Sequence, residues 1–480
     1  MIAVADNPKI LKAAAALRQL ATASWGYDAV DDTARRQAPR STNRSEDNVL
    51  PAAQRTRLTA TTRQIRRNFS IAGWMIRKHL DYVSSFGFQA RTGEKGLNAR
   101  IEDLMVWWSR PANCDVAARH GLPMMTRLAE CSRTVDGDVL LLKLSDGRLQ
   151  AIEGDRIYTP YGTLPPGTTA AEWTHGVQTD AYGRAKAYMV CKRSKSGTRT
   201  YERILRAGFC LLHGYFDRFD QIRGISPLAA AINSLRDVYE GCDYALAKMK
   251  LSQLFGLVTY RESAEPLAPV SGQTDDDGDE AAEAKYDVDF GKGPFHLDLD
   301  PGDKADFLEA KTPPTEFREF CGTVIAMGLK GLDIPYSFYD ESFTNFYGSR
   351  GGLIQYLKSC EAKRAAVRDL LDNLTAWRLR LFVEDGVLEL PAGMNPADLR
   401  WEWVPAGVPW WDPVKEVRGH VAAIRSGLTT PQRVCQEVGT DFQDNVDAIA
   451  EAMAYAQERG VQLEFADFGP TTEVHTDAGN

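Results

Sequence analysis

The sequence predicts an α+β protein in which an acidic insert separates two long amphipathic helices. Apolar residues recur every three or four positions behind Ser226-Pro227 and again behind Thr312-Pro313, which indicates capped helices. An apolar run at 139–144 followed by Asp146-Gly147 is typical of a strand and its hairpin turn. Between the two helices, residues 264–310 hold fourteen acidic residues and three lysines. Helices, strands and insert together favour the α+β class.

The first half of the chain predicts an arm followed by a mixed domain. Residues 1–50 are rich in alanine and polar residues, and we expect an arm or linker there. Within 51–225, helices are predicted at 55–83 and 100–108. Further short strands are predicted at 149–152, 176–179 and 187–191, and residues 180–183 would connect the last two.

The helix behind Ser226-Pro227 is predicted to reach about Leu254. Serine can cap the free N–H groups at its start, and proline suits the first helical position. At roughly 1.5 Å per residue such a helix is on the order of 40 Å long, so we expect it to span something. Its apolar stripe comprises Leu228, Ala231, Ile232, Leu235, Val238, Tyr239, Cys242, Leu246 and Met249.

A second helix is predicted from Pro313 to about Gly331, and a third from about Arg350 to about Phe382. The loop between them, residues 334–348, carries six aromatic side chains among short polar ones. The apolar face of the second helix comprises Phe317, Phe320, Cys321, Val324, Ile325 and Leu329.

The C-terminal part predicts a return to the mixed domain and then three helices. Residues 387–404 are expected to rejoin that domain, and helices should start at Asp412-Pro413, Thr430-Pro431 and near Asp441. The tail after residue 460 predicts a flexible segment. The four tryptophans in this part favour packing over a sugar or nucleotide platform: Trp401, Trp403, Trp410 and Trp411.

Charge is unevenly distributed along the 480 residues. Residues 1–130 hold 20 Lys and Arg against 12 Asp and Glu, although the whole chain has a net charge of −8. The stretch from Arg35 to Lys78 holds eleven basic residues, including Arg55, Arg57, Arg63, Arg66 and Arg67. Two interpretations stay open for it: a solvated helix face, or a contact to phosphate or to an acidic neighbour.

The acidic insert contains the run Asp275-Asp276-Asp277-Gly278-Asp279-Glu280. This run resembles a calcium loop in composition, but it lacks the alternating acidic spacing and the terminal glutamate of such a loop. We expect a mobile, solvated loop.

The motifs of common enzymes are missing from the sequence. Gly291-Lys292 is followed by Gly293 and is not preceded by the glycine of a phosphate-binding loop. The zinc-protease, nucleophile-elbow and dinucleotide signatures are absent as well. His213 and His420 lie near Cys210 and Cys435 in sequence, but satisfied core or surface residues are the favoured interpretation. We expect no catalytic residue, metal or cofactor, and therefore no enzyme.

Cysteine usage and hydropathy favour a protein made in the cytoplasm. The eight cysteines include no C-x-x-C pair, and several lie on apolar helix faces, so free buried thiols are expected rather than disulfides or metal ligands. No uncharged apolar run approaches the 18 residues of a membrane helix, and residues 1–12 lack the apolar core of a signal peptide.

Several motifs in order give the chain its resemblance to a known family. Three lie around the long helices: Arg223-Gly224-Ile225-Ser226-Pro227-Leu228, Gly331-Leu332-Asp333-Ile334-Pro335-Tyr336 and Asn345-Phe346-Tyr347-Gly348-Ser349-Arg350. Others stand at 66–68, 84–88, 180–188, 409–416 and 424–429. With these motifs, over roughly residues 40–460, the chain resembles the lambda-type portal proteins of tailed bacteriophages.

The resemblance implies a ring with a wing, stem, clip and crown. It would place the wing at 51–225, the first stem helix at 226–257, the clip at 258–311 and the second stem helix at 312–332. The tunnel loop would be 333–349, the wing-spanning helix with its return strands 350–411, the crown 412–460 and a flexible tail 461–480. The implied stem-packing residues are Leu228, Ile232, Leu235, Tyr239, Cys242, Leu246, Phe317, Phe320, Val324 and Ile325.

The same resemblance implies a DNA channel at one capsid vertex. The implied channel residues are Tyr336, Ser337, Phe338, Tyr339, Asp340, Glu341, Ser342, Phe343, Thr344, Asn345, Phe346 and Tyr347. Partners would be further copies of the chain in a ring of about twelve, double-stranded DNA bound without sequence specificity, a terminase ATPase, the major capsid protein and head-completion or tail connector proteins. The protein would reside in the virion after assembly in the host cytoplasm. Acidic walls suit such a channel, because a strongly basic wall would bind the phosphates and hold the duplex.

Two other functions are weighed against this expectation. A DNA-processing enzyme would require convergent carboxylates or a nucleotide-binding loop, which the sequence does not show. A non-viral structural scaffold would give no reason for an aromatic loop between two capped helices.

Overall fold

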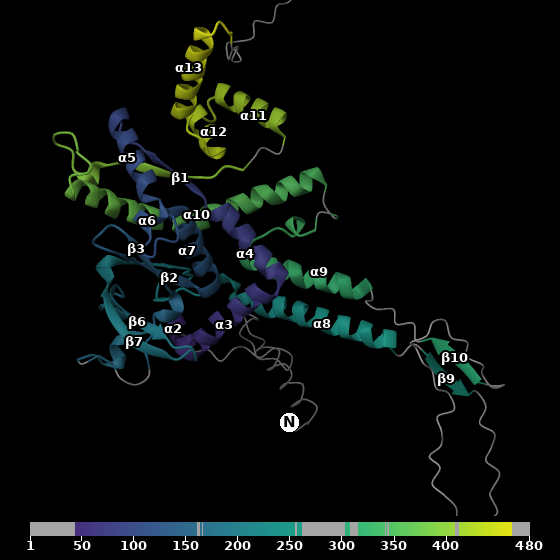
Figure 1. The fold of residues 1–480 in the computed structure, drawn as a ribbon. Helices are drawn as coiled ribbons and strands as arrows, with labels where there is room; N and C mark the ends of the chain where they lie inside the picture. Colours follow the sequence, from purple (N-terminus) through teal and green to yellow (C-terminus); the bar gives the residue numbers. More distant parts are fainter. Residues whose placement is uncertain are drawn as a thin grey trace, which may run out of the picture.

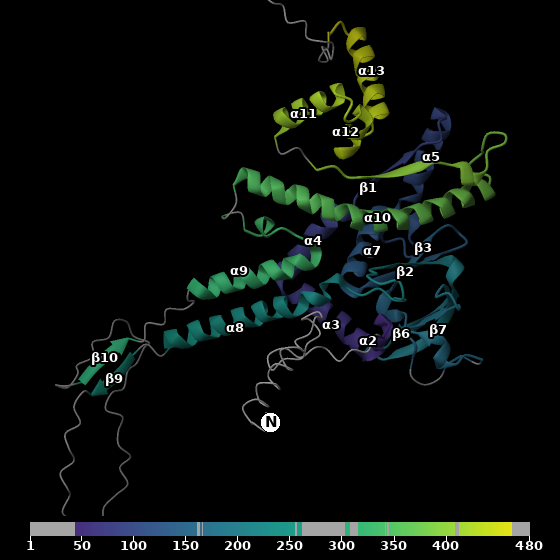
Figure 2. The same cartoon turned by 180° about the vertical axis from the view of Figure 1, so that it is seen from behind.

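The computed structural model describes residues 44–160, 164–165, 167–254, 257–261, 303–307, 315–340, 342, 345–408 and 412–462. Helices and strands mix within these residues, as an α+β class requires. A mixed body lies on one side, a pair of helices projects from it, and a small group of C-terminal helices stands apart (Figures 1 and 2). Some parts of the chain lie outside the described residues: the predicted N-terminal arm up to residue 43, most of the acidic insert with its run 275–280, Trp410 with Trp411, and the tail after 462.

The helices of the body precede and follow its first strand. They are α2 (Glu46–Val49), α3 (Ala52–Asn68), α4 (Ser70–Val83), α5 (Lys95–Trp108), α6 (Pro111–Cys114) and α7 (Leu122–Asp136). The prediction of one helix over 55–83 was wrong, because Phe69 between α3 and α4 is extended, at φ −106° and ψ 111°. Its ring is buried and lies 5.6 Å from the ring of Tyr239. A side chain at Gly73 would approach the Arg66 carbonyl oxygen to 3.1 Å, so a glycine suits the tight corner.

Two antiparallel sheets form the lower part of the body. The first has the order β3-β2-β8, with β2 (Asp138–Lys143) between β3 (Leu149–Glu153) and β8 (Cys210–Gly214). Leu140 of β2 stands opposite Ile152 and Leu212, so the central strand is covered by both neighbours. The second sheet has the order β4-β5-β6-β7: β4 (Trp173–Thr174), β5 (Val177–Thr179), β6 (Ala185–Arg193) and β7 (Arg199–Arg206). The predicted hairpins at 146–147 and 180–183 are both confirmed.

Helix α10 (Phe346–Glu384) crosses the whole body (Figure 1). With 39 residues it is on the order of 60 Å long. It starts four residues before the predicted Arg350, because the side chain of Asn345 caps it by accepting a hydrogen bond from Gly348 N at 2.8 Å. Phe346 and Tyr347 therefore belong to the helix rather than to the loop.

The predicted return of the chain after α10 is confirmed by a two-stranded sheet. β11 (Trp401–Pro405) pairs antiparallel with β1 (Phe86–Ala90) on the far side of α10 from the two larger sheets (Figure 1). Trp403 packs edge-on against Phe88, 5.1 Å between ring centroids, and its indole N–H donates to Thr375 Oγ1 at 3.1 Å. The indole N–H of Trp401 donates to Asp372 at 2.8 Å. Both tryptophans serve packing, as expected.

The projecting pair consists of α8 (Ile232–Leu254) and α9 (Thr315–Leu329). This pair is called the arm below and is distinct from the N-terminal arm predicted for residues 1–50. The two helices run side by side in both views, with the hairpin of β9 (Leu257–Arg261) and β10 (Asp303–Phe307) beyond their far ends (Figures 1 and 2). The predicted start at Pro227 is a 3₁₀ turn, Pro227–Ala230, in which Ser226 Oγ accepts from Leu228 N at 3.2 Å. The α-helix itself begins at Ile232.

The C-terminal helices are α11 (Pro413–Arg425), α12 (Pro431–Glu437) and α13 (Phe442–Glu458). Each start agrees with the prediction, and each is capped by the expected side chain: Asp412, Thr430 or Asp441. Within these three helices, Ala456 is buried while most other apolar side chains are exposed. The caps are local, but this group has little apolar core of its own.

Candidate functional site

The segment between α9 and α10 begins with a fixed anchor at Asp333. Asp333 is left-handed at φ 61°, a conformation that aspartate tolerates better than most residues. Its carboxylate accepts hydrogen bonds from Lys363 Nζ at 2.8 Å and from Ser359 Oγ at 2.6 Å, both on α10. Burial opposes ionisation, but these hydrogen bonds and the lysine charge lower the pKa of Asp333. Lys363 also donates to the Leu332 carbonyl oxygen at 2.7 Å, which ties the end of the arm to α10.

The first aromatic residues of the predicted channel loop pack against the body. The Phe338 ring lies 6.0 Å from Tyr82 of α4 and 5.4 Å from Tyr356 of α10. The Tyr339 ring lies 6.3 Å from Trp74 of α4 and 5.6 Å from Tyr336. Tyr336 and Phe338 are half-buried against the core, and Tyr339 is 40% exposed, so this half of the loop packs on the body.

The second half of the loop is exposed where the structure describes it. Asp340 Oδ1 accepts from Ser342 N at 2.9 Å and from Ser342 Oγ at 2.5 Å, and these hydrogen bonds lower the pKa of Asp340. The side chain of Tyr347, in the first turn of α10, is exposed. Glu341, Phe343 and Thr344 lie outside the described residues, as does the side chain of Phe346.

The predicted stem-packing residues divide into two groups. Leu228, Ile232, Leu235 and Ile325 are buried, and Phe317 and Val324 are half-buried. A side chain at Gly328 would approach Leu235 Cδ2 to 2.8 Å, so α8 and α9 pack closely there. Tyr239, Cys242, Leu246 and Phe320 are exposed in the single chain, and their part in stem packing stays a prediction. A pair of helices covers only one side of each helix, which leaves these side chains at the surface.

Exposed apolar side chains form a stripe on α9. Phe320 and Met327 are each 60% exposed and stand seven residues apart, about two helical turns, so they share one face. Tyr244 on α8 is 74% exposed. Gly328, next to Met327, faces Leu235 of α8, so the exposed stripe lies off the line of contact between the two helices.

A buried ion pair fixes the point where the chain leaves the body for the arm. The guanidinium of Arg223 donates two hydrogen bonds to the Asp138 carboxylate, each 2.7 Å long. It also donates to the carbonyl oxygens of Ile157, His175 and Gly154 at 2.7 to 2.8 Å. Every polar atom of the guanidinium thus has a partner, as a buried charge requires. From the sequence, Arg223 is recognisable only as part of the motif 223–228, because nothing local identifies Asp138 as its partner.

A second buried cluster holds β8 to α4 and α7. Glu130 accepts from His79 Nε2 at 2.8 Å, from His213 Nε2 at 3.1 Å and from Arg133 at 3.0 Å. Burial opposes ionisation, yet the hydrogen bonds from both histidines and the charge of Arg133 keep the pKa of Glu130 far below its ordinary value. Burial raises the pKa of Cys210 to about 11, so its thiol stays protonated at neutral pH. His213 is therefore a satisfied core residue, as favoured above.

In the basic stretch near the N-terminus, some arginines contact acidic neighbours and others lie on a solvated helix face. Arg63 lies 2.7 Å from Asp136 and 3.2 Å from Asp155, and Arg55 lies 3.8 Å from Asp47. Arg57, Arg66 and Arg67 are solvent-exposed. The acidic neighbours of the first two arginines belong to the same chain.

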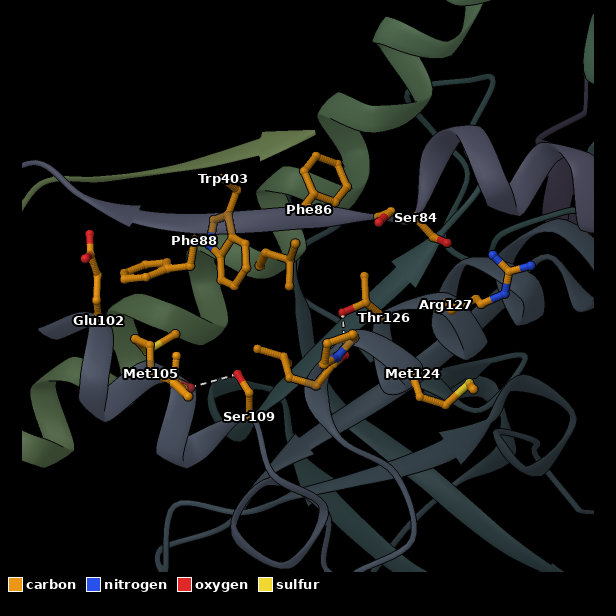
Figure 3. A pocket seen from close by; sticks show the side chains of 15 residues that line it. Ser84, Phe86, Phe88, Glu102, Met105, Ser109, Met124, Thr126, Arg127 and Trp403 are labelled. Carbon is orange, nitrogen blue, oxygen red and sulfur yellow. Dashed lines mark hydrogen bonds between the residues drawn. The ribbon is translucent and has the colours of Figure 1, made fainter. Parts of the chain in front are cut away.

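The hollow shown in Figure 3 has a volume of about 670 Å³ and lies among β1, α5, α7 and α10. Phe86, Phe88 and Trp403 lie along one side of it. The hydroxyl of Ser109 donates to the Met105 carbonyl oxygen at 2.7 Å, and that of Thr126 to its own helix. Both hydroxyls are thus engaged within the chain, and the lining offers no pair of groups arranged for acid–base chemistry.

No group of three or more histidine, cysteine, aspartate or glutamate side chains suited to a metal ion occurs among the described residues. None of the helices described there combines the length and the apolar character needed to cross a bilayer.

Comparison with known proteins shows which family the chain is similar to. A family model described as phage portal protein, lambda family, matches residues 33–364, more than half of the chain. A probable portal protein of Halomonas phage phiHAP-1 is 24% identical over 384 residues, which cover 75% of this chain and 71% of that protein. Among solved structures, a chain in the neck of an empty gene transfer agent particle has a TM-score of 0.46 and 13% identity, covering 79% of this chain and 93% of its own. A chain from the virion of the native particle has a TM-score of 0.44 and 13% identity, covering 81% and 99%.

Proposed function

Because the chain belongs to the lambda family of phage portal proteins, we propose that it forms a ring of about twelve subunits at one capsid vertex. Double-stranded DNA would be packaged and ejected through the centre of this ring. The observation that carries the proposal is the arm, whose α9 stripe of Phe320 and Met327 is left uncovered by the described part of its own chain. Exposed apolar side chains at helical spacing suit the contact between neighbouring copies.

The positions of the elements support an assignment of the parts of the ring. We assign the mixed body to the wing, α8 and α9 to the stem, and α10 to the helix that spans the wing. The segment beyond the arm, with β9 and β10, is assigned to the clip, and α11 to α13 to the crown. The arm supports this assignment because it projects from the body and carries the hairpin beyond its far ends (Figures 1 and 2).

In this proposal fewer residues of the loop face the channel than the sequence suggested. Tyr336, Phe338 and Tyr339 hold the loop on the body, so the part that faces DNA is residues 340–345 with Tyr347 at the start of α10. Asp340 and Glu341 make this part acidic. An acidic loop repels the phosphates of the duplex, and DNA can then slide past it.

In this proposal, the ATPase that drives DNA packaging is a separate protein. We propose that a terminase ATPase docks at the clip end and is later replaced by head-completion or tail connector proteins, while the wing contacts the major capsid protein. The ring would assemble in the host cytoplasm and remain in the virion. The purified ring is expected neither to hydrolyse ATP nor to cleave DNA, because its contribution is geometry and charge. ATP hydrolysis that copurifies with the ring through every step and persists without terminase would contradict this.

The ring is tested at the α9 stripe. Phe320→Asp places a charge on the proposed contact and should shift the protein from rings to monomers, as seen by mass photometry and negative-stain microscopy. Phe320→Leu, which keeps an apolar side chain at the same site, should leave the rings intact. Because Phe320 is exposed, neither substitution should change the stability of the fold of a single subunit, which circular dichroism can check. Normal rings from Phe320→Asp would place the subunit contact elsewhere.

The loop is tested by charge reversal. Asp340→Lys with Glu341→Lys should preserve rings yet slow packaging, and the effect should be larger at low salt because screening is weaker there. Ser342→Ala removes polar contacts without adding charge and serves as the control. Packaging at wild-type rates at every salt concentration would remove this loop from the channel.

A further inference from the structure

The arm carries two cysteines that face each other across its helices. Leu235 of α8 meets Gly328 of α9, where an added side chain would come within 2.8 Å of Leu235 Cδ2. Cys242 stands seven residues after Leu235, and Cys321 stands seven residues before Gly328. Seven residues are about two helical turns, so in an antiparallel pair both steps return to the same contact line. The register therefore sets Cys242 opposite Cys321.

Further observations agree with this register. The pKa of Cys321 is raised by burial first and then by the neighbouring thiol of Cys242. Gly241, beside Cys242, has the Phe317 ring of α9 within 3.8 Å of where its side chain would start. The pKa of Tyr339 is raised by burial first and then by Tyr336, Asp340 and both thiols.

The pair differs from the five buried thiols in its access to solvent, and Cys435 is half-buried like Cys321. Cys242 is exposed and Cys321 is half-buried, whereas Cys114, Cys131, Cys191, Cys210 and Cys360 are buried. Burial raises the pKa of Cys114 to about 12 and that of Cys191 to about 11, so these thiols are poor nucleophiles at neutral pH. Oxidants in solution therefore meet the arm before they meet the core.

We propose that Cys242 and Cys321 are a redox-responsive pair that forms an intrachain disulfide joining α8 to α9. With a disulfide oxidant such as oxidised glutathione, one cysteine thiolate attacks a glutathione sulfur and releases one glutathione thiolate. The second cysteine thiolate then attacks the protein sulfur of the mixed disulfide, forms the Sγ–Sγ bond and releases the second glutathione. Two protons leave the cysteines, and two molecules of reduced glutathione result.

The bond would act on the part of the chain that we assign to the stem, and this consequence rests on the proposed function. In a reducing cytoplasm both thiols stay reduced, so α8 and α9 can adjust during assembly and packaging. In a released particle, outside the cell, oxidation would fix the two helices to each other. The chemistry itself rests only on the arm of a single chain.

Peptide mapping of the purified full-length protein tests the pair. After incubation with oxidised glutathione, alkylation of free thiols and trypsin digestion, peptide 237–248 should be linked to peptide 319–330, with a mass two hydrogens below their sum. Reductant should separate them. Cys242→Ser and Cys321→Ser should each abolish the linked peptide, and Cys435→Ser should retain it. The rate should rise from pH 7 to pH 9, because the thiolate is the attacking species.

A non-reducing gel separates the proposed bond from a bond between subunits. Oxidised protein should migrate as a monomer when the bond is intrachain, whereas dimers that require Cys242 or Cys321 would overturn the proposal. Full alkylation of both cysteines after oxidation would overturn it as well. Mass photometry of the same sample reports assembly independently, so a failure of the ring and a failure of the disulfide are distinguishable.

Discussion

The body and the arm place their charged and apolar groups in opposite ways. In the body, Arg223 and Asp138 form an ion pair whose side chains are each at most 2% exposed, and Glu130 is equally enclosed. On the arm, the pair Arg236 and Glu240 lies in solvent, while Phe320 and Met327 are largely exposed. The body thus buries these charged groups within one chain, whereas the arm leaves apolar side chains exposed. The C-terminal helices resemble the arm, because most of their apolar side chains are exposed.

The largest expected effect comes from breaking the ion pair of the body. Asp138→Ala leaves Arg223 buried without its counter-charge and should lower the free energy of unfolding by roughly 3 to 5 kcal/mol. Chemical denaturation followed by circular dichroism measures this. Asp146→Ala removes a carboxylate that pairs with Arg148 at the surface of the hairpin and should cost less than about 1 kcal/mol. Equal losses in the two variants would erase the distinction between buried and exposed pairs.

The next effect concerns the contact inside the arm. Leu235→Ala removes a buried side chain against Gly328 and should destabilise the arm by about 3 kcal/mol. Hydrogen exchange should accelerate in α8 and α9 but not in β2 or β8, because the arm projects from the body. Leu246→Ala, at an exposed position of the same helix, is the control. Acceleration that spreads equally through the body would mean that arm and body unfold as one unit.

A smaller effect is expected where the C-terminal helices meet the body. Asp441 accepts from Arg91 at 2.6 Å and also caps α13 through Gln443 N at 2.7 Å. Asp441→Ala should destabilise these helices by about 1 to 2 kcal/mol, since a cap and a partly buried ion pair are lost together. Asp447→Ala breaks a pair with Lys95 that is exposed on both sides and should change little. Limited proteolysis between residues 405 and 412 would report the loosening; equal cleavage in both variants would argue against the cap.

The smallest effect is the pH dependence of the anchor at Asp333. Its folded-state pKa lies below the ordinary value of 3.8, so its contribution is fully present above that pH and is lost as the pH falls through the folded-state pKa. Asp333→Asn tolerates the left-handed backbone and should cost less than about 1 kcal/mol at pH 7, because the carboxylate is half-exposed. The stability difference from wild type should shrink below pH 4. A difference that stays constant from pH 7 to pH 3 would show that the charge of Asp333 contributes nothing.

Local signals in the sequence predicted the starts of several elements well. Ser226-Pro227, Asp412-Pro413 and Thr430-Pro431 each mark a helix start, because a capping side chain and a proline act within a few residues of themselves. Asp146-Gly147 likewise marks its turn, with Gly147 at φ 80°. The predicted single helix over 55–83 failed, because the break at Phe69 depends on packing against Tyr239 of a distant helix.

The candidate site was predicted only in outline. The aromatic residues of the loop were identified by composition, but composition does not say that Phe338 packs on Tyr82 and Tyr356 while Tyr347 stays in solvent. The stem stripe was found by its periodicity, yet periodicity cannot distinguish Leu235, which is buried and meets Gly328, from Phe320, which is 60% exposed.

The sequence by itself determined the order of the helices, their caps, the acidic insert and the family, because each of these depends on residues that are neighbours along the chain. The tertiary structure decided that Arg223 pairs with Asp138, that β1 pairs with β11 and that Leu235 meets Gly328. These contacts join residues about 85 to 315 positions apart, and the free energy that selects them comes from burying charge, backbone and apolar surface together. No local pattern encodes that selection.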